Sequence, residues 1–108
     1  MQLEPEFNPL DFEGFEWDSG NVAKNDKHSV EPEEAEEIFL NEPLLVLEDE
    51  KHSKLEMRWH ALGRTAKRQL FVVFTVRGKL IRVISARSMS KREKAVYEKT
   101  ILRSRSKP

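Results

Sequence analysis

The stretch from Leu70 to Arg87, LFVVFTVRGKLIRVISAR, constrains the fold of this chain more than any other. Its first seven residues are apolar on both alternating faces, which is typical of a central strand covered above and below. Gly78 supplies the backbone freedom that a tight reversal needs, and a second strand is expected from Leu80 to Ser85. That strand carries Arg82 between apolar neighbours. The pattern predicts a β-hairpin that holds cations on a rigid platform.

Sequence patterns on either side of the hairpin predict further strands and helices. The expected elements are a short strand at 15–18, a weak helix at 20–28 capped by Asp18 or Ser19, a helix at Pro32–Leu40, strands at 44–47 and 56–64, and a helix from the capping-box sequence at Ser90 to about Leu102. This order predicts an α+β fold with one antiparallel-rich β-sheet. Two N-terminal helices and one C-terminal helix would gather largely on one face of that sheet.

Composition indicates one domain without a membrane segment. The chain has 108 residues and no cysteine, so disulfides are excluded and a reducing compartment is compatible. No apolar run approaches the roughly 18 residues of a membrane-spanning helix, and the first residues lack the pattern of a signal peptide. We expect a single domain at 15–102, a flexible N-terminal tail at 1–14 and a basic tail at 103–108.

The net charge of zero conceals a separation of charge along the chain. Residues 1–50 hold 16 acidic and 2 basic residues, a net −14, whereas residues 51–108 hold 3 acidic and 17 basic residues, a net +14. Such a separation is typical of an anion-binding face beside a partner-binding or self-shielding surface. The alternative is that the two halves only neutralise each other across the fold. Because many basic residues lie on predicted strands, we prefer the first interpretation.

An ordered set of motifs resembles the BrnT toxins. They are Phe15-Glu16-Trp17-Asp18, Lys24-Asn25, Lys27-His28, Glu33-Glu34-Ala35, Glu48-Asp49 with His52, Glu56-Met57-Arg58-Trp59-His60-Ala61-Leu62-Gly63-Arg64, Ile84-Ser85-Ala86-Arg87, Arg92-Glu93 and Tyr97. The resemblance covers about 15–98. Ser29 departs from it, because the family usually has glycine there, and a left-handed turn costs more at a serine.

The resemblance implies a bacterial type II toxin–antitoxin system. Its toxin would have a fold similar to the RelE ribonucleases and would cleave RNA in the cytoplasm, which halts translation. Its expected partner is a BrnA-like antitoxin with a ribbon-helix-helix DNA-binding part. Toxin and antitoxin would form a heterotetramer that represses its own operon.

RNA cleavage without a metal needs acid–base groups and cations that stabilise the phosphorane. His28 and His60 are the acid–base candidates by their ordinary pKa. The cations that can hold the scissile phosphate are Lys27, Arg58, Arg64, Arg82 and Arg87, since the arginine fork meets two phosphate oxygens. Tyr97 can donate a proton or stack on a base. No cofactor is expected, because three histidines in no ligand spacing do not indicate a metal site.

Structural interpretations compete at several of these residues. Lys27 and His28 also suit the C-terminal end of a solvated helix, and His60 is equally consistent with filling a strand face. His52 lies in a polar turn, which favours a structural or exposed residue. The two tryptophans, Trp17 and Trp59, are expected in the core rather than as base-stacking platforms. Arg82 and Arg87 can instead pair with the acidic run at 48–50 and tie strands together.

Three functions remain open at this point. A ribonuclease toxin predicts cleavage of single-stranded RNA without added metal, leaving a 2′,3′-cyclic or 3′-phosphate. A non-catalytic nucleic-acid-binding regulatory module with the same basic face predicts salt-dependent binding without cleavage. An interaction protein whose acidic half binds a basic partner predicts no affinity for nucleic acid.

Overall fold

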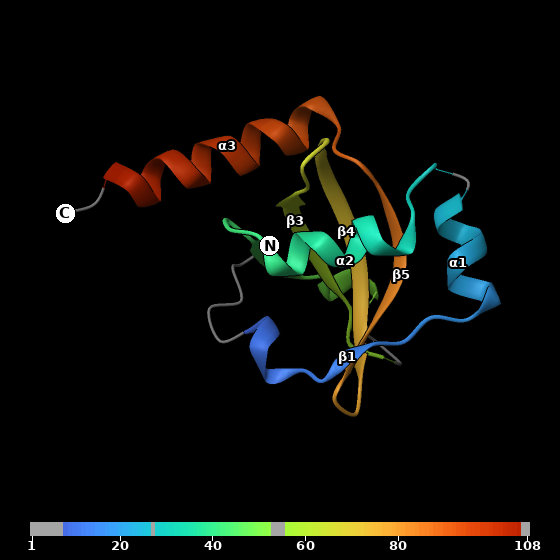
Figure 1. Ribbon diagram of the computed structural model, residues 1–108. Helices are drawn as coiled ribbons and strands as arrows, with labels where there is room; N and C mark the ends of the chain where they lie inside the picture. The colour runs from blue at the N-terminus through green and yellow to red at the C-terminus, as the bar shows by residue number, and fades with distance from the viewer. Residues whose placement is uncertain (1–7, 27, 53–55, 107–108) are drawn as a thin grey trace.

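The computed structural model describes residues 8–26, 28–52 and 56–106. It has an α+β fold with one sheet and three α-helices, as the sequence predicts (Figure 1). The elements are β1 (Gly14–Phe15), α1 (Ser19–Asp26), α2 (Pro32–Leu40), β2 (Leu45–Glu48), β3 (Trp59–Arg64), β4 (Gln69–Arg77), β5 (Leu80–Ser88) and α3 (Lys91–Ser106), with short 3-10 helices at Pro9–Asp11 and Glu50–His52.

The sheet is built around the predicted hairpin. Its strand order is β1-β5-β4-β3-β2, so the apolar strand β4 lies at the centre. Strands β2 to β5 pair antiparallel in succession, whereas β1 runs parallel to β5, which makes the sheet mixed. Gly78 turns the chain between β4 and β5 with a φ of 61°, a left-handed conformation that glycine adopts without strain.

One face of the sheet, which we call the core face, is closed by α2. Ala35, Ile38 and Phe39 of α2 pack against a buried cluster that includes Val72 and Phe74 of β4. A Cβ added at Gly63 of β3 would lie 2.8 Å from the Ile38 Cβ, so this helix packs close to the strand backbone. Phe12 also packs against this cluster.

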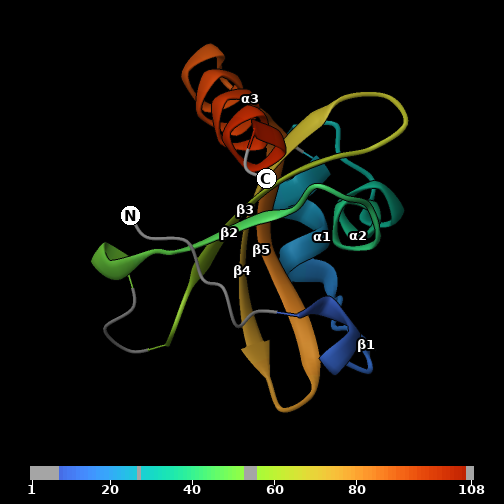
Figure 2. The same cartoon turned by 90° about the vertical axis from the view of Figure 1, so that its left-hand side faces the viewer.

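The opposite face carries α3 across one end of the sheet. Tyr97 and Ile101 of α3 pack with Leu62 of β3 and Phe71 of β4 in a second, smaller cluster. The helices therefore lie on both faces of the sheet, rather than largely on one, and Figure 2 shows α1 and α2 apart from α3. Leu62 and Phe71 alternate with core-face residues, so each strand supplies side chains to both helix layers.

The two tryptophans are half-buried and pack against the core-face cluster, which agrees with the prediction that they serve packing. Trp17 packs against the core-face cluster, and its Nε1 donates a hydrogen bond of 2.7 Å to Glu36. Trp59 stacks on Phe74 with ring centroids 5.7 Å apart.

The predicted boundaries of helices and strands agree best with the structure where local sequence signals are strong. The helix at Pro32–Leu40 and the capping box of α3 are as predicted, with the Ser90 N–H donating to Glu93 at 2.8 Å. The predicted strand 56–64 was wrong in its first part, since β3 begins at Trp59. The carbonyl of Met57 accepts a hydrogen bond from the Thr75 hydroxyl at 2.6 Å, so a side chain replaces ladder pairing there. The weak helix runs 19–26 rather than 20–28, and α3 continues past Leu102.

Candidate functional site

An irregularity in the β4–β5 pairing brings Arg82 and Arg87 to one face. Val73 pairs with Ser85 and the next residue of β4 pairs with Val83, so Ile84 is an extra residue in β5. Side chains five positions apart in a regular strand point to opposite faces, and a bulge reverses that alternation. Arg82 is therefore opposite Thr75, and Arg87 is opposite Phe71.

These residues define the arginine face, the side of the sheet opposite α2. It comprises His60, Arg64, Phe71, Thr75, Arg82 and Arg87. The helix α3 covers the end of this face near Phe71.

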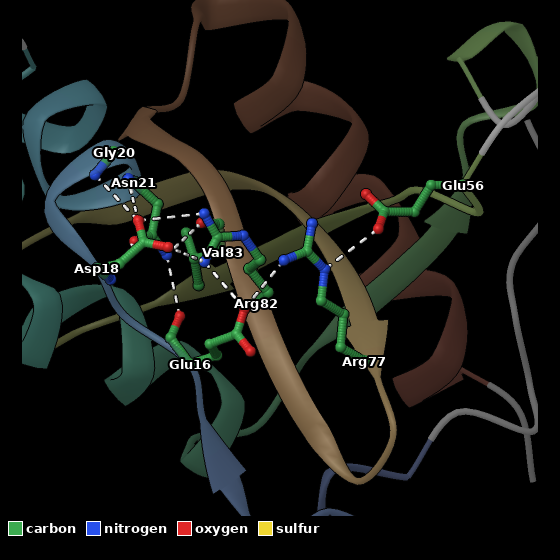
Figure 3. Close-up of polar contacts among 8 residues, drawn as sticks. All are labelled: Glu16, Asp18, Gly20, Asn21, Glu56, Arg77, Arg82 and Val83. Atoms are coloured by element: carbon green, nitrogen blue, oxygen red, sulfur yellow. Dashed lines mark hydrogen bonds and ion pairs between the residues drawn. The ribbon is translucent and has the colours of Figure 1, made fainter.

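Arg82 is held by two carboxylates from the segment between β1 and α1. Its Nη1 lies 2.9 Å from Asp18 Oδ2 and donates to Glu16 Oε1 at 3.0 Å, and its Nη2 donates to Asp18 Oδ1 at 3.2 Å. Figure 3 shows the guanidinium between the two acids. The Arg82 side chain is only 15% exposed. Because an unpaired guanidinium is costly at such burial, the acids allow it to remain on the sheet.

Asp18 is itself held by the start of α1. Its Oδ1 accepts hydrogen bonds from the backbone N–H groups of Gly20 at 2.9 Å and Asn21 at 3.2 Å, and the Asn21 side chain accepts from the Asp18 N–H at 2.7 Å. This is a reciprocal N-terminal cap. The hydrogen bond from Arg82, followed by that from Asn21, lowers the pKa of Asp18 below its ordinary value.

A chain of ion pairs extends from Arg82 across the hairpin. Arg77 Nη1 donates to Glu16 Oε1 at 3.2 Å, and Arg77 Nε donates to Glu56 at 3.3 Å (Figure 3). Glu16 therefore bridges the two arginines through one oxygen.

Arg87 is held in a similar way by α3. Its Nη1 and Nη2 donate to the two carboxylate oxygens of Glu93 at 2.8 and 2.9 Å, and its guanidinium carbon lies 4.4 Å from the centroid of the Phe71 ring. Burial raises the pKa of Glu93, but hydrogen bonds from Arg87 and the Ser90 N–H outweigh it and leave the pKa below its ordinary value. At 38% exposure, Arg87 is more open to solvent than Arg82.

His60 lies inside the arginine face rather than at its surface. Its Nε2 is 3.0 Å from Asp49 Oδ2, and its ring packs on Phe71 with centroids 4.8 Å apart. Its Nδ1 is buried and has no hydrogen-bond partner among the residues that the structure describes. In this conformation one ring nitrogen is paired with an acid and the other is shielded from solvent.

Arg64 and Tyr97 lie near the α3 end of the face. Arg64 is exposed, and its Nε donates to the Glu42 carbonyl at 3.0 Å. Tyr97 is 1% exposed, and its hydroxyl donates to the Pro43 carbonyl at 2.6 Å. Burial raises the pKa of Tyr97, with a smaller opposing effect of the Arg64 charge.

The remaining predicted residues lie on other segments or outside the described ranges. His28 is exposed in the connection between α1 and α2, and Arg58 is half-buried just before β3. Lys27 lies outside the described residues, as does the side chain of His52. Ser29 has a φ of 57°, so the left-handed turn is present at a serine. Its carbonyl accepts a hydrogen bond of 2.7 Å from Arg68.

Sequence analysis missed the acids that hold the two arginines. The alternative pairing of Arg82 and Arg87 with residues 48–50 was wrong. Arg82 pairs with Glu16 and Asp18, and Arg87 pairs with Glu93. A local signal existed in both cases, since Asp18 and Glu93 were recognised as capping residues. No pattern connected Asp18 to an arginine 64 positions away.

The described residues show no gathering of three or more histidine, aspartate or glutamate side chains that could hold a metal. Within the same ranges, no helix combines the length and apolar character needed to cross a membrane.

Comparison with known proteins identifies the family. No curated protein matches the chain. A family model described as the ribonuclease toxin BrnT of type II toxin–antitoxin systems matches residues 17–93, which include both arginines and the acids Asp18 and Glu93. The match covers most of the chain and confirms the resemblance seen in the sequence motifs. The chain therefore belongs to the BrnT family of ribonuclease toxins.

Proposed function

We propose that this chain is a metal-independent endoribonuclease toxin that cleaves RNA on the arginine face and thereby inhibits translation. The observation that carries the proposal is the placement of Arg82 and Arg87 on one face, each held by a carboxylate. Family membership supports the ribonuclease class. Arginine remains protonated at every physiological pH, so it stabilises phosphorane charge without a bound cation.

The proposed reaction is an internal transfer of the RNA phosphate. The 2′-oxygen loses its proton and forms a bond to phosphorus, and the bond from phosphorus to the 5′-oxygen breaks. The 5′-oxygen takes up a proton, so the products are a 2′,3′-cyclic phosphate and a free 5′-hydroxyl. Arg82 would neutralise the charge that develops on the phosphorane oxygens.

Other predicted site residues enter the proposal with roles that their surroundings suggest. His28 is the exposed acid–base candidate, with Lys27 beside it in sequence. Arg58 and Arg64 would contact phosphates away from the cleaved bond. His60 and Tyr97 are already paired within the fold, which suits them to support Phe71 and α3.

The proposed partner is a BrnA-like antitoxin in a heterotetramer that forms in the cytoplasm. An antitoxin that covers the arginine face would exclude RNA and neutralise Arg82 and Arg87 in one contact. The proposal also includes a RelE-like fold, which the α+β architecture and the three helices support.

A second candidate function is a non-catalytic nucleic-acid-binding regulatory module of the same fold. The observation that favours it is the pairing of both arginines with carboxylates of the same chain, which reduces the positive charge of the face. It predicts RNA binding that weakens steeply between about 50 and 200 mM salt, with the RNA left intact.

The deciding experiment is cleavage of single-stranded RNA by the purified chain in excess EDTA. We expect cleavage products with 5′-hydroxyl ends, and a loss of kcat/KM of about 10²–10³ in Arg82→Ala. Lys79→Ala is the matched control, because Lys79 is a 73% exposed cation on the same hairpin, and it should retain wild-type activity. Activity that disappears in EDTA and returns with Mg²⁺ would contradict the proposal. Intact RNA with persistent binding would favour the regulatory module.

A further inference from the structure

We propose that Asp18 and Glu93 are positioning residues that hold Arg82 and Arg87 as two separate phosphate contacts along one RNA strand. The inference rests on the proposed ribonuclease function and assigns a distinct place in the substrate to each arginine. Arg82 contacts the scissile phosphate, and Arg87 contacts a flanking one.

The Asp18–Arg82 and Glu93–Arg87 ion pairs share a common construction. Asp18 caps α1 and accepts the N–H groups of Gly20 and Asn21. Glu93 lies in the first turn of α3 and accepts the Ser90 N–H at 2.8 Å. Each carboxylate is therefore anchored to the backbone of a helix N-terminus before it meets its arginine. An anchored acid fixes the direction of the guanidinium, whereas a free surface acid would not.

The guanidinium groups of Arg82 and Arg87 each keep one edge available for a ligand. Asp18 and Glu93 both engage the Nη1 and Nη2 end. Among the described residues, neither Arg82 nor Arg87 has an acceptor at Nε. The Nε–Nη2 side is the second edge at which arginine binds two oxygens of a phosphate.

Arg68 provides an internal contrast to these two arginines. Its Nε and Nη2 both donate to Glu34 at 2.8 Å, its Nη1 donates to Ser88, and its Nη2 also meets the Ser29 carbonyl. All of its edges are in use within the protein. The chain thus contains an arginine tied into the fold by its Nε–Nη2 edge and two arginines that keep that edge available.

Arg82 and Arg87 are also separated along the sheet. They lie opposite Thr75 and Phe71, which are four positions apart on β4, and this corresponds to roughly 13 Å along the strand. Because each guanidinium is tied to its own carboxylate rather than to a shared one, we assign the two arginines to different phosphates. The Arg82 side chain is less exposed than that of Arg87, at 15% against 38%, and it is held by two carboxylates rather than one. We therefore assign the more firmly held cation, Arg82, to the scissile phosphate.

The test uses two substitutions that preserve the helix caps. Asp18→Asn keeps an N-cap residue, and Glu93→Gln keeps a capping-box residue, but each removes one carboxylate charge from an arginine. In Asp18→Asn, Arg82 keeps only its contact with Glu16 among the described carboxylates. Steady-state cleavage would be measured on a dinucleotide RNA and on a long single-stranded RNA, with circular dichroism to verify folding. Glu56→Gln is the matched control, since Glu56 pairs with Arg77 and not with either proposed contact.

The two variants should change different kinetic parameters, one kcat and the other KM. Asp18→Asn should lower kcat by about 10–100-fold on both substrates, because a small displacement of the cation at the reacting phosphate is costly. Glu93→Gln should raise KM about 3–10-fold on the long RNA with kcat unchanged, the result expected when uniform binding is lost. It should have no effect on the dinucleotide.

Three results would overturn the inference while leaving the ribonuclease function intact. The first is wild-type kcat in a folded Asp18→Asn variant, and the second is increased activity, which would mean that the acid masks Arg82. The third is an equal effect of Glu93→Gln on both substrates. If Asp18→Asn does not fold, the inference is tested by Glu93→Gln and Arg87→Ala alone. Each should impair cleavage of the long RNA and leave cleavage of the dinucleotide unchanged. Failure of the wild type to cleave in EDTA would overturn the proposed function and this inference together.

Discussion

The two faces of the sheet differ in how completely the chain fills them. On the core face, Val72, Phe74 and Val83 are 0% exposed and α2 closes the layer above them. On the arginine face, the same strands β4 and β5 present Thr75, Arg82 and Arg87, and α3 covers one end. The same strands therefore stabilise the fold through the core face and hold cations in place on the arginine face.

The strongest test of this division is a large deletion on the core face. Phe74→Ala should destabilise the fold by about 3–5 kcal/mol, because it removes a fully buried ring that contacts Phe39 and Trp59. Chemical denaturation would measure the change in the free energy of unfolding. The kcat per folded molecule should stay near the wild-type value. A lower kcat per folded molecule would contradict the division between a stabilising core face and a catalytic arginine face.

Substitution of Arg68 tests whether an arginine of this chain can contribute to stability without a role in RNA cleavage. Arg68→Ala should cost about 1–3 kcal/mol, because it removes hydrogen bonds to Glu34 and the Ser29 carbonyl. RNA cleavage by the folded variant should be unchanged. Arg68→Lys should recover little stability, since lysine cannot bond both oxygens of Glu34 in one plane. A loss of cleavage comparable to that of Arg82→Ala would show that this distinction between arginines is wrong.

Tyr97 lies where α3 meets the arginine face, so its substitution distinguishes a structural role from a catalytic one. Tyr97→Phe should lower stability by about 1 kcal/mol, because the Pro43 carbonyl loses its 2.6 Å hydrogen bond. If the hydroxyl contributes only to stability, kcat measured in RNA cleavage assays stays at the wild-type value. A fall of about 10²-fold or more would instead assign the hydroxyl to proton transfer.

The smallest expected effect is the acid dependence of stability. The pKa values of Asp18, Glu34 and Glu93 are lowered in the fold, Asp18 and Glu34 chiefly by their arginines. The folded state then binds fewer protons than the unfolded state, so stability rises with pH in this range. The contribution is complete above the ordinary values of 3.8 and 4.5 and is lost as pH falls through the folded values.

Thermal denaturation from neutral to acidic pH would measure this dependence. Glu34→Gln should flatten the curve at its acidic end, because it removes one of the three carboxyls whose pKa is lowered in the fold. An unchanged slope would show that the Glu34–Arg68 pair adds nothing to acid sensitivity.

Local signals explain which elements were predictable. Pro32 and the apolar spacing of Ala35, Ile38 and Phe39 define α2, and the Ser90–Glu93 capping box defines the start of α3. The start of β3 was not predictable, because Met57 alternates correctly for a strand, yet its carbonyl bonds the Thr75 side chain. The side of the sheet that α3 covers also has no local signal, since apolar residues of β4 alternate to both faces.

The central hairpin, the helix caps and the family could be predicted from the amino-acid sequence, because each depends on residues close together or on an ordered set of motifs. The arrangement of the site, in contrast, depends on contacts between distant segments. The bulge at Ile84 turns Arg82 and Arg87 to the same face, and this depends on how β5 pairs with β4. Asp18 meets Arg82 across 64 positions. Such contacts follow from strand register and chain path, which involve the whole sheet and leave no mark in a local pattern.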